Sequence, residues 1–136
     1  MKKVLLISIC VLALIIALIV GVTIYQRSVS KEYVRLNEDM AITIHNDIYK
    51  NTISAREKWK NTDVVIIGTV DSINSNRFHM DFIYGSRVGS IFVETSKKEI
   101  LKLNRGDKVK VCGEMKVGMY DGALSIHIDA DEIIKQ

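Results

Sequence analysis

The sequence predicts a mainly β protein with helices at its N-terminal end. We expect a single transmembrane helix, an amphipathic helix, and a five-stranded barrel with a short helix between its third and fourth strands. Three observations predict this architecture: the chain has only 136 residues, residues 4–24 form an uncharged apolar run, and the spacing of apolar residues changes from four to two near Thr62. The expected parts are an anchor (1–24), an exit linker with the amphipathic helix (25–61) and the barrel (62–136).

The apolar run VLLISICVLALIIALIVGVTI has the length of a membrane-spanning helix. At about 1.5 Å per residue it covers roughly 30 Å, the thickness of the hydrocarbon region of a bilayer. It is also longer than the apolar core of about 7–15 residues that a cleaved signal peptide carries. Cys10 does not fit a lipoprotein signal, because the bulky Ile9 precedes it and the run continues beyond it. We therefore expect a retained anchor; the alternative is a cleaved signal, with Gly21 as the plausible small residue.

Charges beside the apolar run bear on its orientation. Under the positive-inside rule, Lys2, Lys3 and the amino terminus compete almost evenly with Arg27, Lys31 and Arg35. The short basic start is that of a signal-anchor, so we expect a single-pass protein of the bacterial inner (cytoplasmic) membrane with its C-terminal domain outside the cytoplasm. Of 19 basic residues, 17 remain against 16 acidic ones when Lys2 and Lys3 are set aside, so the domain shows no basic field for nucleic acid.

Residues 31–60 have the pattern of an amphipathic helix, with Ser28 or Ser30 as a candidate N-terminal cap. The apolar residues recur mostly at four-residue steps, and the pattern thins near Asn51, where the helix could break. They are Leu36, Met40, Ile44, Ile48, Ala55 and Trp59. This stripe needs an apolar surface to cover, and one end of the barrel supplies it.

From residue 64 onward the chain alternates apolar and polar residues, which is typical of strands. Gly68 lies inside the first strand, where a small barrel needs a sharp bend. Ser96 and Glu99 have the spacing of a capping box and predict a short helix. The expected strands are 64–71, 77–84, 90–95, one that follows a tight turn at Gly106-Asp107 and runs on to Met115, and 123–129, with the helix at 96–103. Five strands with a helix between the third and fourth are the order of an OB fold, which we expect to curl into a closed barrel.

Two stretches resemble a known family, the tRNA_anti-like domains, also described as OB-fold putative lipoproteins. In DIYKNTISAREKWKNTDVVIIGTVDSI, the residues Asn51, Ala55 and Trp59 are followed by Gly68-Thr69-Val70, which is similar to the family's G-x-V. LNRGDKVKVCG is similar to its L-x-x-G-D-x-V-x-V-x-G. The likeness covers roughly residues 44–130 and implies the fold together with a place outside the cytoplasm. The chain departs from the family in having no usable lipobox.

A ligand surface is expected on the outer face of the second and third strands and the neighbouring loops, as in other OB folds. The candidate ligand-binding residues are Arg77, His79, Tyr84, Arg87 and Tyr120. A protein, a peptide or a cell-envelope component is the expected ligand, and single-stranded nucleic acid is the alternative. Asp81 lies in the middle of this face, and the same residues would also suit an ordinary solvated surface.

No reaction is predicted. Cys112 alternates with Val109 and Val111 and has no identifiable histidine partner, so a packed strand residue explains it as well as a nucleophile does. The stretch HIDADE places His127, Asp129 and Asp131 on one strand face, which a weak cation site or an ordinary polar face would explain. The three histidines lack close metal-ligand spacing. We expect neither enzymatic activity nor a cofactor nor a metal.

Overall fold

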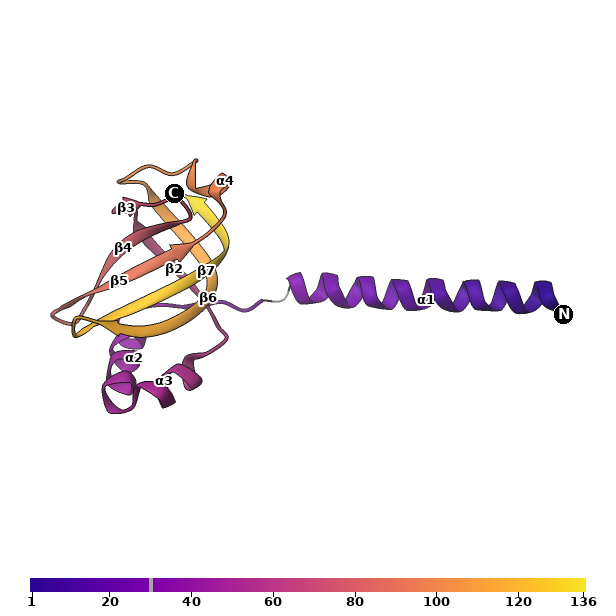
Figure 1. Cartoon of the computed structure of the whole chain (residues 1–136), viewed down its shortest axis with the longest axis horizontal. Coiled ribbons are helices and arrows are strands. Elements are labelled where there is room, and N and C mark those ends of the chain that lie inside the picture. The colour runs from indigo at the N-terminus through magenta and orange to yellow at the C-terminus, as the bar shows by residue number, and fades with distance from the viewer. Residues whose placement is uncertain (30) are drawn as a thin grey trace. The chain divides into compact units, whose positions relative to one another are not determined.

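The computed structural model describes residues 1–29 and 31–136, and it divides into two compact units, Met1–Glu32 and Tyr33–Gln136. The first unit consists of α1 (Lys2–Val29) and the few residues after it (Figure 1). Within the described residues, Lys3–Ile24 is the one stretch of helix long and apolar enough to span a membrane, with a mean hydropathy of 3.3. Of the two expected caps, Ser30 and the side chain of Ser28 lie outside what the structure describes.

The helix expected over residues 31–60 is wrong in its start and is divided in two. Residues Val34–Arg35 form a short strand, β1, and α2 (Glu38–Lys50) and α3 (Thr52–Trp59) follow. Asn37 caps α2, its side-chain oxygen accepting from the Met40 backbone N–H at 2.9 Å. Asn51 ends α2 and caps α3 by accepting from the Ser54 N–H at 3.0 Å. Because a capping asparagine has extended backbone angles, each one interrupts the helix that the apolar stripe alone would continue.

One seven-stranded sheet forms the barrel unit, in the order β1-β2-β6-β7-β5-β4-β3. Its other strands are β2 (Thr62–Thr69), β3 (Ser72–Ile73), β4 (Arg77–Tyr84), β5 (Arg87–Glu94), β6 (Lys108–Tyr120) and β7 (Ala123–Lys135), with α4 (Lys97–Ile100) between β5 and β6 (Figure 1). β2 and β3 are successive parts of one bent stretch of chain, and they pair with β6 and β4 respectively. Five long segments in this order, with a helix between the third and fourth, are the predicted OB fold.

The sheet curls but is not closed by hydrogen bonds. β1 and β3 are its two edges, and no ladder joins β2 to β4 within the described part of the chain. The expected closed barrel is therefore wrong in this respect, because the chain bends between Thr69 and Ser72 and turns from one partner strand to the other.

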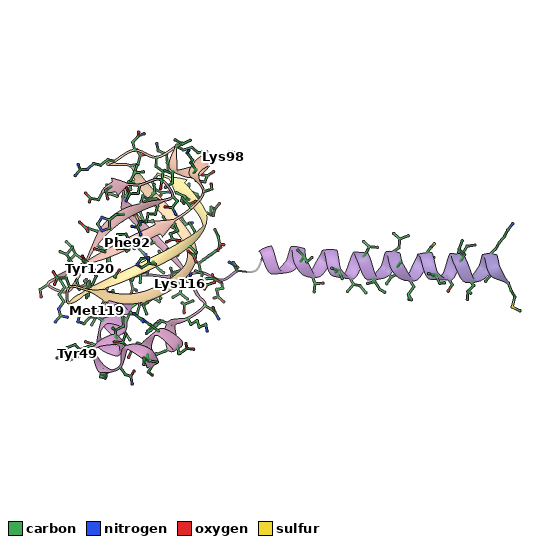
Figure 2. The ribbon with its side chains drawn as sticks, viewed as in Figure 1. Tyr49, Phe92, Lys98, Lys116, Met119 and Tyr120 are labelled. Atoms are coloured by element: carbon green, nitrogen blue, oxygen red, sulfur yellow. The ribbon has the colours of Figure 1, made fainter. Side chains whose placement is uncertain are left out.

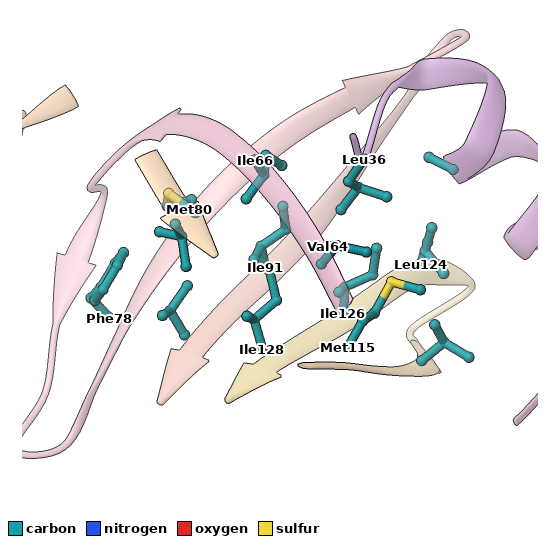
Figure 3. Packing of buried hydrophobic residues seen from close by; sticks show 14 of the residues in the cluster. Leu36, Val64, Ile66, Phe78, Met80, Ile91, Met115, Leu124, Ile126 and Ile128 are labelled. Carbon is teal, nitrogen blue, oxygen red and sulfur yellow. The ribbon is translucent and has the colours of Figure 1, made fainter. Parts of the chain in front are cut away.

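The core fills the inside of this curled sheet, as alternation predicted. Phe78 and Met80 of β4, Ile91 of β5, and Ile126 and Ile128 of β7 all point inward and are buried (Figure 3). The α2–α3 segment covers one end of the barrel, and α4 lies at the other (Figure 1). The expected stripe supplies the cover: its buried members are Leu36, Ile44, Ile48 and Ala55, with Met40 and Trp59 partly buried against the same core.

The turn in the stretch LNRGDKVKVCG is bonded to the end of the last strand. Gly106 has a φ of 90°, which a glycine adopts without steric cost. The Asp107 carboxylate accepts from the Lys135 ammonium at 2.8 Å and from the Asn104 N–H at 2.8 Å, and these two bonds lower its pKa. The turn thereby holds the end of β7, which runs to Lys135 and not only to the expected Asp129.

Candidate functional site

Two of the predicted ligand-binding residues, Tyr84 and Arg87, lie apart from the outer sheet face. Tyr84 was expected to be accessible where the second strand meets its loop, but it is the last residue of β4 and strand alternation turns it inward, so only 2% of its surface is exposed. Its hydroxyl oxygen accepts from the Leu124 N–H at 3.0 Å and is 3.0 Å from Nδ1 of His45. Arg87 begins β5 and its guanidinium contacts Nε2 of His45. Tyr84 therefore offers no ring to a ligand.

Arg87 determines the protonation of the buried His45. An arginine side chain can only donate, so Nε2 of His45 must accept, and the proton of the neutral ring lies on Nδ1 and is donated to Tyr84. Burial lowers the pKa of His45, and the charge of Arg87 lowers it further. The neutral ring thus links α2 to β4 and β5.

Fold stability should consequently fall as the pH drops below about 6.5, the ordinary histidine value. The folded-state pKa of His45 is lowered, so below that pH the unfolded chain binds a proton that the folded chain refuses. Urea unfolding, followed by the fluorescence of the single tryptophan, should give a midpoint that decreases from pH 7.5 to pH 5.5. The decrease should be smaller in His45→Gln; equal slopes for the two proteins would contradict this assignment.

The remaining predicted residues, Arg77, His79 and Tyr120, do lie on the outside of the sheet. Tyr120 ends β6 and is 79% exposed. His79 faces outward between the buried Phe78 and Met80, as the sequence predicted. The structure joins Arg77 and His79 through a residue that the sequence did not single out, Phe92.

Three rings from neighbouring strands lie in a row across the outer face. His79 on β4 is directly opposite Phe92 on β5, which is directly opposite His127 on β7. The His79 and Phe92 ring centroids are 5.0 Å apart, and those of Phe92 and His127 are 5.1 Å apart. The Arg77 guanidinium carbon is 5.6 Å from the centre of the Phe92 ring. We call His79, Phe92 and His127 the ring row, and it provides stacking surface with a cation above its middle ring.

Carboxylates surround the ring row. Asp71 and Asp81 lie 3.4 and 3.2 Å from the two ring nitrogens of His79. At the other end of the row, Lys116 is directly opposite His127, and its ammonium is 2.7 Å from the Asp129 carboxylate. That hydrogen bond raises the pKa of Lys116, which therefore stays charged. The surface is one of balanced, mixed charge.

A cleft of about 510 Å³ adjoins the His127 end of the row, and we call it the α3 cleft. Its volume lies in the range of pockets that hold small ligands or short peptide segments. Figure 2 shows Phe92 together with the cleft residues Lys116, Met119 and Tyr120. The lining consists of Arg56, Glu57 and Lys60 from α3 and its end, Lys116, Val117, Gly118, Met119 and Tyr120 from β6, and Ser125 and His127 from β7.

Side-chain bonds between α2 and α3 position the helical wall of this cleft. The Asp47 carboxylate on α2 accepts from the Lys58 ammonium at 2.7 Å and from the Trp59 indole N–H at 3.0 Å. The Lys58 bond is the main cause that lowers the pKa of Asp47. Ala55 is buried on the inner side of α3, which leaves Arg56 and Lys60 exposed toward the cleft. The cleft therefore combines an apolar floor with cations on fixed elements.

Sequence reasoning did not find Arg56, Lys60, Phe92 and Lys116, and it placed His127 only on a polar face. The signal that could have found Phe92 and Lys116 is strand register, since both lie in the cross-strand line of His79 and His127. Cys112, by contrast, is buried, and burial raises the pKa of its thiol, so the thiolate is disfavoured.

Solved structures of similar fold include several OB-fold proteins. The small single-stranded DNA-binding protein from Streptomyces coelicolor is 19% identical over 56% of this chain and 94% of its own, with a TM-score of 0.43. Replication protein A of U. maydis, solved bound to single-stranded DNA, is 17% identical over 79% and 75%, with a TM-score of 0.45. The hypothetical protein ygiW from E. coli is 19% identical over 62% and 86%, with a TM-score of 0.40.

No protein-family model matches the sequence, and no curated relative does. The resemblance to the tRNA_anti-like domains is therefore supported only at the level of the OB fold, which the strand order itself establishes. Fold and cleft together define the class of the protein as an OB-fold binding module.

Proposed function

We propose that the chain is a membrane-anchored OB-fold module that binds a protein, peptide or cell-envelope ligand outside the bacterial cytoplasm. One observation carries this proposal: the ring row leads directly into the α3 cleft, because His127 belongs to both. A ligand lying across β5, β7 and β6 would stack on Phe92 and place an apolar group against Met119. The rim cations Arg56 and Lys60 would meet an acidic group of that ligand.

The charge around the row favours such a ligand over single-stranded nucleic acid. Nucleic-acid sites combine stacking rings with a groove of uncompensated cations that follows the phosphates. The ring row has the stacking element, and Arg77 lies over it, but Asp71, Asp81 and Asp129 adjoin its two ends. A phosphate backbone would meet those carboxylates, whereas a ligand carrying both signs of charge would pair with them.

Binding rather than catalysis is the proposed activity. The thiol of Cys112 is buried and its pKa is raised, which is unfavourable for a nucleophile. His79 lies between two carboxylates on a half-buried surface, and His127 stacks on Phe92, so both rings are held as parts of a recognition face.

Topology tests the proposed location. A reporter enzyme that is active only outside the cytoplasm, fused after Gln136 of the full chain, should be active and should remain with the membrane fraction. The physical reason is that Lys3–Ile24 is long and apolar enough to span a membrane once, and a basic start precedes it. A well-expressed but inactive fusion would reverse the orientation, and an active fusion found in the soluble fraction would show cleavage.

A further inference from the structure

The edge of β2 that faces away from β6 has backbone hydrogen bonds at its two ends, and among the described residues no ladder covers the part between them. The Val65 carbonyl accepts from the Leu36 N–H at 3.0 Å, and the Asp71 N–H donates to the His79 carbonyl at 2.8 Å. In a strand, alternate residues direct both backbone groups to the same edge. Ile67 and Thr69 lie between Val65 and Asp71 in that alternation, so their N–H and C=O groups face this edge too.

β4 has a similar edge, and it lies across from β2 where no ladder joins the two strands. Its Arg77 and His79 carbonyls accept from Asn74 and Asp71, so its odd-numbered residues face away from β5. Ile83 follows in the same alternation, and the β4–β5 register is regular throughout. Within residues 1–29 and 31–136, no strand ladder joins β4 to β2. Two strand edges that no ladder joins therefore border the seam between β2 and β4.

A groove of about 430 Å³ lies at this seam, lined by β1, the start of α2, β2, β4 and β6. Two of its apolar side chains are accessible: Ile67 is 50% exposed and Ile83 is 73% exposed. Exposed strand edges with apolar side chains are templates on which a further strand pairs, and proteins ordinarily protect them with charges, prolines or bulges. The strand registers are regular through Ile67 and Ile83, so no bulge interrupts the edge at either residue.

The chain itself shows that this edge of β2 accepts an added strand. Val34 and Arg35 of β1 pair in parallel with Val64 and Val65, and the chain then leaves the edge to enter α2. The groove also contains two cations, Arg35 and Lys110, and one carboxylate, Glu38, which accepts from the Gly85 N–H at 2.7 Å. Among the described residues neither cation forms an ion pair. A ligand with a carboxylate would complement them.

We propose that the seam groove takes a short extended peptide as an added strand, with apolar side chains at alternate positions and an acidic residue at one end. Its backbone would pair with the edge groups of Ile67 and Ile83, its apolar side chains would cover these two residues, and its carboxylate would lie beside Arg35 and Lys110. This second site shares no lining residue with the ring row or the α3 cleft, so it stands apart from the proposed function.

The experiment uses the full chain in detergent micelles and a fluorescent heptapeptide that alternates threonine and valine and ends in aspartate. We expect saturable binding by fluorescence anisotropy, weakened at least tenfold when alternate peptide nitrogens are methylated, since methylation removes the donors that pair with a strand edge. Replacing the terminal aspartate with an amidated asparagine should weaken binding to the native chain. The same replacement should have a much smaller effect on binding to Lys110→Glu, because that variant lacks the Lys110 cation.

Protein variants locate the site. Ile83→Asp should abolish peptide binding, while Val88→Asp should leave it unchanged, because Val88 is the exposed residue directly opposite Ile83 on β5 and does not line the groove. Both replace exposed side chains, and tryptophan fluorescence would verify that both fold. Binding that survives methylation, equal losses in the two variants, or no binding would overturn the proposal. Phe92→Ala should not affect this peptide, so the outcome is separate from that for the ring row.

Discussion

Gly113→Ala is expected to destabilise the fold by about 3 kcal/mol or more, the upper range for overpacking a well-packed core. A Cβ at Gly113 would lie 2.2 Å from the Asp129 carbonyl oxygen and 2.9 Å from the Ala130 Cα. Both are backbone atoms of β7, and they cannot move aside as a flexible side chain would. The register of β6 and β7 also shifts between Cys112 and Gly113, so the close approach is part of how the two longest strands stay paired.

Gly118→Ala is the matched control, because it makes the same chemical change on the same strand. A Cβ there would find its nearest neighbours, the Arg56 guanidinium and the Ser125 carbonyl, both at 3.9 Å, which is ordinary contact. Urea unfolding followed by Trp59 fluorescence should show a large loss for Gly113→Ala and a change within about 1 kcal/mol for the control. Similar losses of unfolding free energy in the two variants would mean that the close approach of the β7 backbone is not what makes Gly113 necessary.

Tyr84→Phe should be the second most damaging change, although it removes only one oxygen atom. That hydroxyl oxygen accepts from the Leu124 N–H and from Nδ1 of His45, both at 3.0 Å and both buried. Each buried donor left without a partner costs about 1–3 kcal/mol, so the two losses together exceed a typical point mutation. Differential unfolding in urea, at a pH where His45 is neutral, measures the effect.

Tyr120→Phe provides the comparison for that measurement. Tyr120 is 79% exposed, so water replaces any bond its hydroxyl makes, and the free energy of unfolding should be almost unchanged. If Tyr84→Phe were as mild as Tyr120→Phe, the buried link between α2, β4 and β7 would not contribute to stability as described.

Hydrophobic spacing predicted the main elements well. Arg77–Tyr84 has the same bounds as the expected strand, and Ser96 caps α4 as its spacing with Glu99 indicated, accepting from the Glu99 N–H at 3.3 Å. The errors lie where a local pattern fits two structures. Leu36 continues the helical stripe in sequence, yet it follows β1, because the edge of β2 supplies a hydrogen-bond partner that local sequence does not reveal.

The candidate site was harder to predict, because its residues come together only through the pairing of several strands. His79 was placed correctly, since one strand's alternation suffices to determine its face. Phe92, His127 and Lys116 join it only through three successive strand registers, one of them the parallel pairing of β5 with β7. Arg56 reaches the cleft because α3 breaks from α2 at Asn51. Such information is nonlocal, and a single sequence does not contain it in readable form.

Site-specific photocrosslinking in living cells tests most directly whether the ring row and the α3 cleft bind a ligand. A photoreactive phenylalanine analogue at Tyr120, on the cleft rim, should give one discrete adduct of the full chain. The same analogue at Lys98, on α4, should give none (Figure 2). The Tyr120 adduct should vanish when Phe92→Ala and Lys116→Glu are added, and nuclease should not change its mass. Equal adducts at Tyr120 and Lys98, an adduct that survives the two substitutions, or no adduct would contradict the account.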